Sequence, residues 1–312
     1  MKTINKYHFP FQTFNLSLFL IFLAIIQSCS PDKKKDQFIE IVTEVMDFQS
    51  VDTIPSGWNT FKYINKSNET HFFLLDKYPA GKTLEDAVKE VIPPFQNGMD
   101  LINEGNDEEG FAEFNKLPAW FFEVVFSGGS GLVSPKNSSL TTIKLEPGYY
   151  IMECYVKMAN GIFHNAMGMT KAIVVNTQDS GNLPPKATVE INISSTEGIS
   201  FENSIPKGIQ VFSVHFKDQI THENFVGHDL NLVKLNDNAN LDALEGWMNW
   251  ADPKGLITPS PDGITFLGGV NDMPAGSTGY FEINLEPGNY AFVSEVPNAS
   301  GKNMLKTFTV KD

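Results

Sequence analysis

Short runs of alternating apolar and polar residues, bounded by glycine, proline, asparagine or serine, recur from residue 38 to the C-terminus. Runs of this length, rich in Phe, Tyr, Ile and Val, predict β-strands. In the first half we expect strands near residues 38–46, 58–64, 71–75, 120–126, 139–145, 149–156 and 170–176. In the second half we expect them near 187–193, 208–216, 228–235, 263–268, 278–285, 289–296 and 305–310. Such a density of short strands favours an all-β fold in which each half is a Greek-key sandwich or barrel.

Helical patterns are confined to two places. In the first half, Thr83 and Asp86 have the spacing of a capping box, and we expect Pro93-Pro94 to end the helix that follows. With further helical turns near 95–104 and 107–116, residues 82–117 form a short helical insert in the first half. Its apolar residues favour packing on the sandwich edge over a partner-binding face. The second half has one expected helix, near 241–250.

Three short motifs occur twice in the same order. Leu145-Glu146-Pro147-Gly148 recurs as Leu285-Glu286-Pro287-Gly288, and the same holds for 126–129 with 266–269 and for 54–57 with 205–208. Ordered repeats of this kind indicate a duplicated domain. The polar, proline-bearing stretch 177–186 is typical of a linker, so we expect domain 1 to span 37–176 and domain 2 to span 187–312.

The N-terminus has the pattern of an export signal. Lys2 and Lys6 precede an apolar run, 16–26, that is too short to span a membrane. Cys29 follows this run, which resembles the lipobox of a bacterial lipoprotein. We therefore expect residues 1–28 to be a lipoprotein signal peptide, Cys29 to carry a lipid, and 29–36 to be a tether. The protein would then be held on a membrane of the bacterial cell envelope, on a periplasmic or cell-surface face, and an ordinary cleaved signal peptide is the alternative.

Composition narrows the possible partners. Of the 312 residues, 41% are hydrophobic and 19% charged, and the 23 basic residues, all lysine, face 37 acidic ones for a net charge of −14. An acidic chain without arginine has no attraction for nucleic acid and no bidentate clamp for phosphate. Nucleic-acid binding and most phosphoryl-transfer chemistry are therefore not expected.

Cys154 is left as a single thiol once Cys29 is lipidated, although an exported compartment favours disulfides. The alternation along 149–156 places its side chain inward with those of Met152 and Val156. An inward thiol without a partner is either a small buried hydrophobe or is held as a thiolate. The neighbouring Tyr150 and its counterpart Tyr290 are expected to be structural.

The order of residues around this thiol resembles that of the cupredoxins, the blue copper proteins. His71 opens a middle strand, and Cys154, His164 and Met169 then surround the loop before the last strand of the domain. The resemblance implies two tandem cupredoxin-like β-sandwiches and one copper ion in domain 1. By position, His71, Cys154 and His164 would be its equatorial ligands and Met169 its axial ligand. The chemistry agrees, because a thiolate, two imidazoles and a thioether hold copper in both oxidation states.

Two departures from the family pattern matter. Nine residues separate Cys154 from His164, more than in plastocyanin-like proteins, so we expect a hairpin with a turn at Asn160-Gly161 to return the histidine to the site. Met167 is an alternative axial ligand, although the spacing favours Met169.

Domain 2 departs further. Ser294 takes the place of the cysteine, and the segment matching 162–168 is expected to shrink to Lys302-Asn303, which leaves only Met304 and either His228 or His222. A serine hydroxyl cannot replace a thiolate in this chemistry, so no blue copper site is expected in domain 2.

The function that these residues favour is that of a lipid-anchored protein with one copper in domain 1, for electron transfer with a redox partner or for copper holding. The alternative is a metal-free cell-envelope module that uses the same fold as a binding scaffold. An enzyme is not expected, because the chain has no His-x-His pair for a second copper centre and no Gly-x-Ser-x-Gly turn for a nucleophile.

Overall fold

In the described part of the first half, the chain folds into seven strands around an apolar core. The computed structural model describes residues 1–3, 6, 8, 38–202, 204–250 and 252–312, so Cys29, the tether and all but five residues of the predicted export signal lie outside the described residues. The strands are β1 (Ile39–Thr43), β2 (Thr53–Asn65), β3 (Leu74–Lys77), β4 (Val125–Gly129), β5 (Ser138–Leu145), β6 (Gly148–Glu153) and β7 (Thr170–Asp179).

The second half contributes eight strands, one more than the sequence predicts. They are β8 (Val189–Ser194), β9 (Gly198–Phe201), β10 (Gly208–Phe216), β11 (Leu230–Leu235), β12 (Ile264–Val270), β13 (Thr278–Leu285), β14 (Gly288–Val293) and β15 (Leu305–Val310). The extra strand is β9, which forms a tight antiparallel pair with β8. It is only four residues long, too short to show an alternating pattern.

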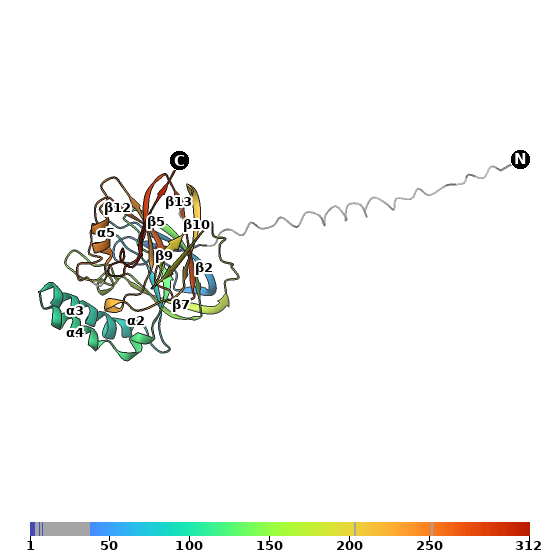
Figure 1. Ribbon diagram of the computed structural model, residues 1–312. Helices are drawn as coiled ribbons and strands as arrows, with labels where there is room; N and C mark the ends of the chain where they lie inside the picture. Colours follow the sequence, from blue (N-terminus) through green and yellow to red (C-terminus); the bar gives the residue numbers. More distant parts are fainter. Residues whose placement is uncertain (4–5, 7, 9–37, 203, 251) are drawn as a thin grey trace. The chain divides into compact units, whose positions relative to one another are not determined.

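The helical insert lies at one side of the strands, where α2, α3 and α4 appear together in Figure 1. It comprises α2 (Leu84–Asp86), the π-helix η1 (Ala87–Val91), α3 (Ile92–Asn103), α4 (Asp107–Glu113) and the 3₁₀ turns η2 (Phe114–Lys116) and η3 (Ala119–Glu123). The other helical elements are η4 (Asn165–Met167), η5 (Glu223–Phe225) and α5 (Leu241–Met248). None of the helices in the described part of the chain is long and apolar enough to cross a membrane.

The start of the insert confirms one expectation and corrects two. Thr83 and Asp86 form the capping box. Pro93-Pro94 do not end the helical segment, because they lie in the first turn of α3, where a proline needs no backbone N–H. The strand expected at 120–126 begins only at Val125, since Ala119–Glu123 form the 3₁₀ turn η3.

Among the described strands, all seven of the first half and four of the eight of the second half lie in one sheet. Its order is β4-β3-β6-β7-β2-β5-β13-β10-β8-β9, with β1 paired to β2, and a second sheet has the order β12-β11-β14-β15. The long strand β2 pairs with β7 near its start and with β5 over the rest of its length. The antiparallel pairing of β5 with β13 joins the two halves, and their apolar side chains form one continuous cluster.

Matching registers show that the halves are structural repeats. Tyr150 of β6 lies opposite Lys77, and Tyr290 of β14 lies opposite Lys234. Each tyrosine is buried, and its hydroxyl donates a hydrogen bond to the backbone carbonyl four residues earlier, at 2.8 Å and 2.9 Å. Both tyrosines therefore hold the turn that leads into their strand, which confirms the structural role expected for them.

Candidate metal centre

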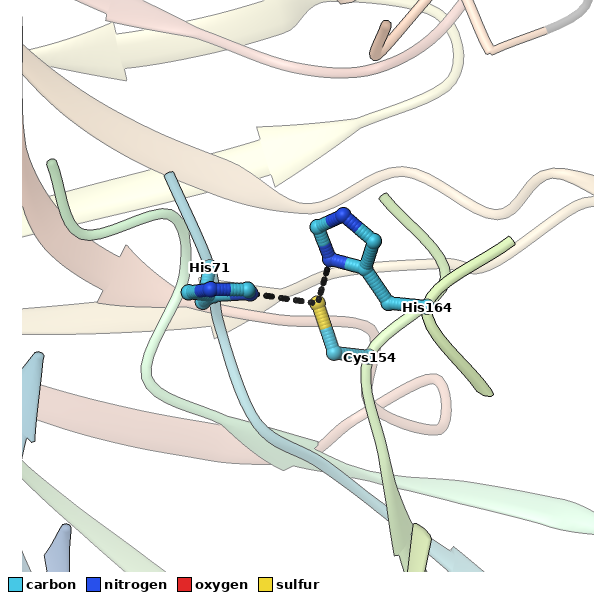
Figure 2. Close-up of side chains that lie close together, drawn as sticks. All are labelled: His71, Cys154 and His164. Carbon is cyan, nitrogen blue, oxygen red and sulfur yellow. Dashed lines mark hydrogen bonds between the residues drawn. The ribbon is translucent and has the colours of Figure 1, made fainter. Parts of the chain in front are cut away.

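His71, Cys154 and His164 converge on one point inside the first repeat (Figure 2). The sulfur of Cys154 lies 3.8 Å from Nδ1 of His71 and 3.7 Å from Nδ1 of His164. Metal–thiolate and metal–imidazole bonds of about 2.3 and 2.0 Å, at an angle near 120°, place the two donor atoms about 3.7 Å apart. The three side chains are fully buried and have the spacing of ligands that share one cation.

Backbone pairing fixes two of the three residues. His71 lies three residues before β3, and its backbone exchanges two hydrogen bonds with Val133, at 3.2 Å and 2.7 Å. Cys154 directly follows β6, and its N–H points to the carbonyl of Met169 at 3.4 Å. Its side chain has no exposed surface, which confirms the inward orientation read from the alternation.

The third residue, His164, returns to the site through a hairpin. Lys157 and Phe163 form an isolated antiparallel β-bridge, and the N–H of His164 donates a hydrogen bond to the carbonyl of Val156 at 2.8 Å. The turn of this hairpin contains Gly161, whose φ of 85° favours glycine. The nine-residue gap is therefore accommodated as expected, by a hairpin with its turn at Asn160-Gly161.

Burial keeps all three groups neutral in the metal-free protein. It raises the pKa of the Cys154 thiol to about 12 and lowers the pKa of His71 to about 4 and that of His164 to about 3. The imidazoles are therefore unprotonated at neutral pH and free to act as ligands. The buried thiol loses its proton only when a cation offsets the cost of the thiolate, so metal binding releases a proton.

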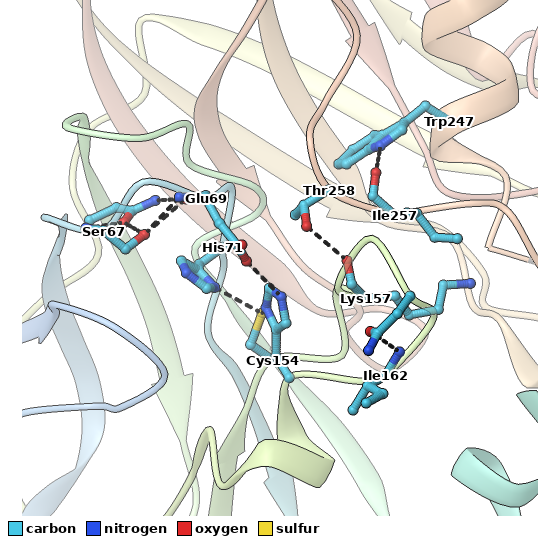
Figure 3. A network of polar contacts seen from close by, with 12 residues as sticks. Ser67, Glu69, His71, Cys154, Lys157, Ile162, Trp247, Ile257 and Thr258 are labelled. Carbon is cyan, nitrogen blue, oxygen red and sulfur yellow. Dashed lines mark hydrogen bonds and ion pairs between the residues drawn. The ribbon is translucent and has the colours of Figure 1, made fainter. Parts of the chain in front are cut away.

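Glu69 lies beside the site and was not among the residues predicted from the sequence. Its Oε2 lies 3.2 Å from Nε2 of His164, on the side of the ring that faces away from the sulfur (Figure 3). A loop network holds the segment, since the Glu69 N–H donates to the hydroxyl of Ser67 and Asn65 donates to the Glu69 carbonyl. A carboxylate behind a histidine orients the ring and makes the other nitrogen a better ligand. The pattern in the sequence that could have indicated this loop network is the spacing Asn65-x-Ser67-x-Glu69 after a strand.

The second repeat covers the hairpin that carries His164. The backbone N–H of Lys157 donates to the Leu256 carbonyl at 2.8 Å, and Thr258 donates to the carbonyl of Lys157 through both its N–H and its hydroxyl (Figure 3). Phe163 stacks on Trp250 with ring centroids 6.2 Å apart. Trp250, Leu256 and Thr258 of the second repeat thus help to hold the hairpin that carries His164, which no sequence motif indicates.

Met169 and Met167 differ in burial. Met169 is fully buried, and its N–H donates to the His164 carbonyl at 3.0 Å, whereas Met167 is 49% exposed. The backbone of Met169 therefore contacts two of the three converging residues, which favours it over Met167 as the source of a thioether. His215 and His222 do not belong to the converging group. Nδ1 of His215 is hydrogen-bonded to the hydroxyl of Thr278, and the ring of His222 packs edge-on against the ring of His228.

The second repeat has the same frame with different side chains. Its register places His228 where His71 stands, and Ser294 and Met304 repeat the backbone contact of Cys154 with Met169, at 3.0 Å. Ser294 donates instead to the carboxylate of Asp229 at 2.9 Å.

One correction concerns the missing histidine of the second repeat. The N–H of Met304 donates to the Ala299 carbonyl at 2.6 Å, which repeats the contact of Met169 with His164. Ala299 therefore stands where His164 does, and the shorter loop lies before this position rather than after it.

Comparisons with known proteins give structural neighbours alone. No family model matches the sequence. No curated protein matches it. Among solved structures, the chain is similar to reduced auracyanin from the photosynthetic bacterium Roseiflexus castenholzii, at 21% identity over 44% of this chain and 95% of that chain, with a TM-score of 0.27.

Two further neighbours are copper proteins by name. Auracyanin A from Chloroflexus aurantiacus, a "blue" copper protein, is 18% identical over 45% of this chain and 98% of its own, with a TM-score of 0.28. Copper nitrite reductase from Nitrosomonas europaea is 12% identical over 88% of this chain and 93% of its own, with a TM-score of 0.23. The candidate metal centre rests on the convergence of His71, Cys154 and His164 in this structure.

Proposed function

We propose that the first repeat binds one copper ion through His71, Cys154 and His164, with Met169 as a weak axial ligand, and that it serves electron transfer or copper holding. The observation that carries this proposal is the convergence of one thiol and two Nδ1 atoms within 4.8 Å in a fully buried site. A thiolate with two imidazoles suits soft or borderline transition metals and disfavours magnesium and calcium. Bound copper would supply a one-electron couple.

The other residues of this chain would act by holding the metal ligands in fixed positions. Three segments fixed by backbone pairing present the donor atoms, and Glu69 sets the ring of His164. The full burial of His71, Cys154 and His164 favours a site that exchanges electrons over one that admits a substrate. A redox partner protein would then dock on the surface rather than reach the metal.

The proposal is tested with residues 30–312, which include the compact unit Phe38–Asp312 with its own core. Copper titration should saturate at one ion per chain and produce an intense visible thiolate-to-copper band. Cys154→Ser should remove the band while leaving the far-UV circular dichroism unchanged. A colourless protein that binds no copper, or binds zinc to the exclusion of copper, would reject the proposal and favour the metal-free scaffold.

The cell-envelope location is a separate proposal, which rests on the sequence of residues 1–36. Lipid attachment at Cys29 would hold the protein on the membrane surface, since two acyl chains anchor where one does not. The full-length protein should partition into the detergent phase, and Cys29→Ala should move it to the aqueous phase or leave it unprocessed. Equal partitioning of both forms would contradict the lipid anchor.

A further inference from the structure

A pocket lies between the helical insert and the sheet of the first repeat, apart from the three converging residues. Its walls are mostly apolar and aromatic, with Phe95 and Phe121 from the insert, Phe163 from the hairpin, and Phe225 and Trp250 from the second repeat. Phe95 packs edge-on against both Phe225 and Trp250, at centroid distances of 6.1 Å and 6.3 Å. The insert therefore builds one side of a hollow that neither repeat could form alone.

Three carboxyl groups line this aromatic hollow. They belong to Asp76 of β3, Glu153 of β6 and Asp272 of the second repeat, and neither a lysine nor a histidine is among the described residues that line the pocket. Within the described part of the chain, none of the three forms an ion pair. Burying carboxyl groups without a basic partner is costly, so a set of three needs an explanation.

Asp76 supplies the second observation. Its side chain is 2% exposed, and its Oδ1 has no hydrogen-bond partner within the described residues. Burial raises the pKa of Asp76 well above its usual value, and the charges of neighbouring carboxylates raise it further. Burial likewise raises the pKa of Asp272 to about 8. A positive charge in the pocket would stabilise the ionised form of both carboxyl groups and lower their pKa.

We propose that this pocket binds a small organic ammonium ion with an apolar body. The ammonium group would pair with Asp76 and Asp272, and the apolar body would lie against the rings of Phe95 and Trp250. Aromatic ring faces attract both cations and apolar groups, and the carboxylates attract cations. The rings and the carboxylates of the pocket therefore favour the same ligand, an ammonium ion with an apolar body. An inorganic cation suits the site less, because among the described residues the three carboxyl groups do not form a set of converging metal ligands as His71, Cys154 and His164 do.

The test uses metal-free protein, residues 30–312, so that it does not depend on copper. Isothermal titration calorimetry would compare 2-phenylethylammonium with the neutral alcohol of the same shape, 2-phenylethanol, and with calcium. The ammonium ion should bind one per chain and at least about tenfold more tightly than the alcohol. Asp76→Asn and Asp272→Asn should each remove most of that preference, while Asp237→Asn, on an exposed residue, should not change it. Phe95→Leu should weaken both ligands alike.

Each other outcome rejects the proposal. Equal affinity for the ammonium ion and the alcohol would mean a merely apolar pocket. Binding of neither ligand would mean that the acids serve the fold alone. Tighter binding of calcium, lost in Asp76→Asn, would mean an inorganic cation site. Thermal unfolding of each variant shows whether it is folded, and the two aspartate variants test the same charge independently.

Discussion

His71 and His228 occupy equivalent positions in the two repeats, each six residues before the lysine that lies opposite Tyr150 or Tyr290 in the strand pairing. Their surroundings differ. His71 turns Nδ1 toward the sulfur of Cys154, whereas Nε2 of His228 lies 2.8 Å from the carbonyl of Asp218, and its ring stacks on Phe216. The same backbone frame thus presents a histidine that faces a thiol in one repeat and a histidine that contacts a backbone carbonyl in the other.

This relationship provides a matched pair of variants. His71→Ala should abolish the visible copper band and lower copper affinity at least about 100-fold, because it removes one of three strong donors. His228→Ala should leave both unchanged, since Ser294 and Ala299 stand in its repeat where Cys154 and His164 stand in the first. Copper titration followed by absorption measures both effects, and loss of copper from the His228 variant would show that the second repeat takes part.

Met169 should tune the site rather than hold the metal. Met169→Leu keeps the volume of the buried side chain but removes the thioether, so copper should still bind and the reduction potential should rise. Met167→Leu is the control, because Met167 is 49% exposed, and it should not shift the potential. Potentiometric titration distinguishes the two, and an unchanged potential in the Met169 variant would exclude an axial role.

The strands could be predicted because alternation is a local pattern in the sequence. The order of the candidate ligands could be predicted because it is read directly along the chain. The strand expected at 208–216 is observed as Gly208–Phe216, and the fold class is confirmed. His71, Cys154 and His164 were predicted together because their order along the chain resembles that of the cupredoxins, and the fold brings the three side chains together.

What could not be predicted depends on pairing between distant segments. The β5–β13 pairing, the cover of the hairpin by residues 250–258 and the Glu69 contact all arise from tertiary structure, which periodicity does not encode. The shorter loop of the second repeat was misplaced for the same reason. Only the hydrogen bond from Met304 to Ala299 identifies which residue replaces His164.

The hairpin should couple loop conformation to copper affinity. Gly161 has φ of 85°, and a methyl group there would also meet the side chain of Asn103 in α3. Gly161→Ala should destabilise the hairpin conformation by about 1–2 kcal/mol. Copper binding, which needs this conformation, should therefore weaken by about tenfold. Gly181→Ala is the control, because it also has a positive φ, 68°, but has open space around it and lies far along the chain from the ligands. It should lower the unfolding temperature without changing copper affinity, and equal copper affinity in both variants would separate the hairpin from the metal site.

Asp272 should make the metal-free protein less stable as the pH rises. Burial, followed by the charge of Asp229, raises the pKa of Asp272 from 3.8 to about 8. Between these values the folded protein keeps a proton that the unfolded chain has lost, so the unfolded state binds fewer protons. The contribution of this group to the free energy of unfolding is therefore fully present below pH 3.8 and is lost as the pH approaches 8.

Asp272→Asn tests that sign, because asparagine fills the same space and cannot ionise. The stability of the variant relative to the natural protein should rise between pH 4 and 8 by up to about 1.4 kcal/mol per pH unit. Urea unfolding at four pH values in this range measures the difference, and Asp237→Asn, on an exposed residue, should give a flat line. A relative stability that is constant or falls with pH would mean that Asp272 is already ionised in the folded protein. It would then need a positive partner at neutral pH even when the aromatic pocket holds no ligand.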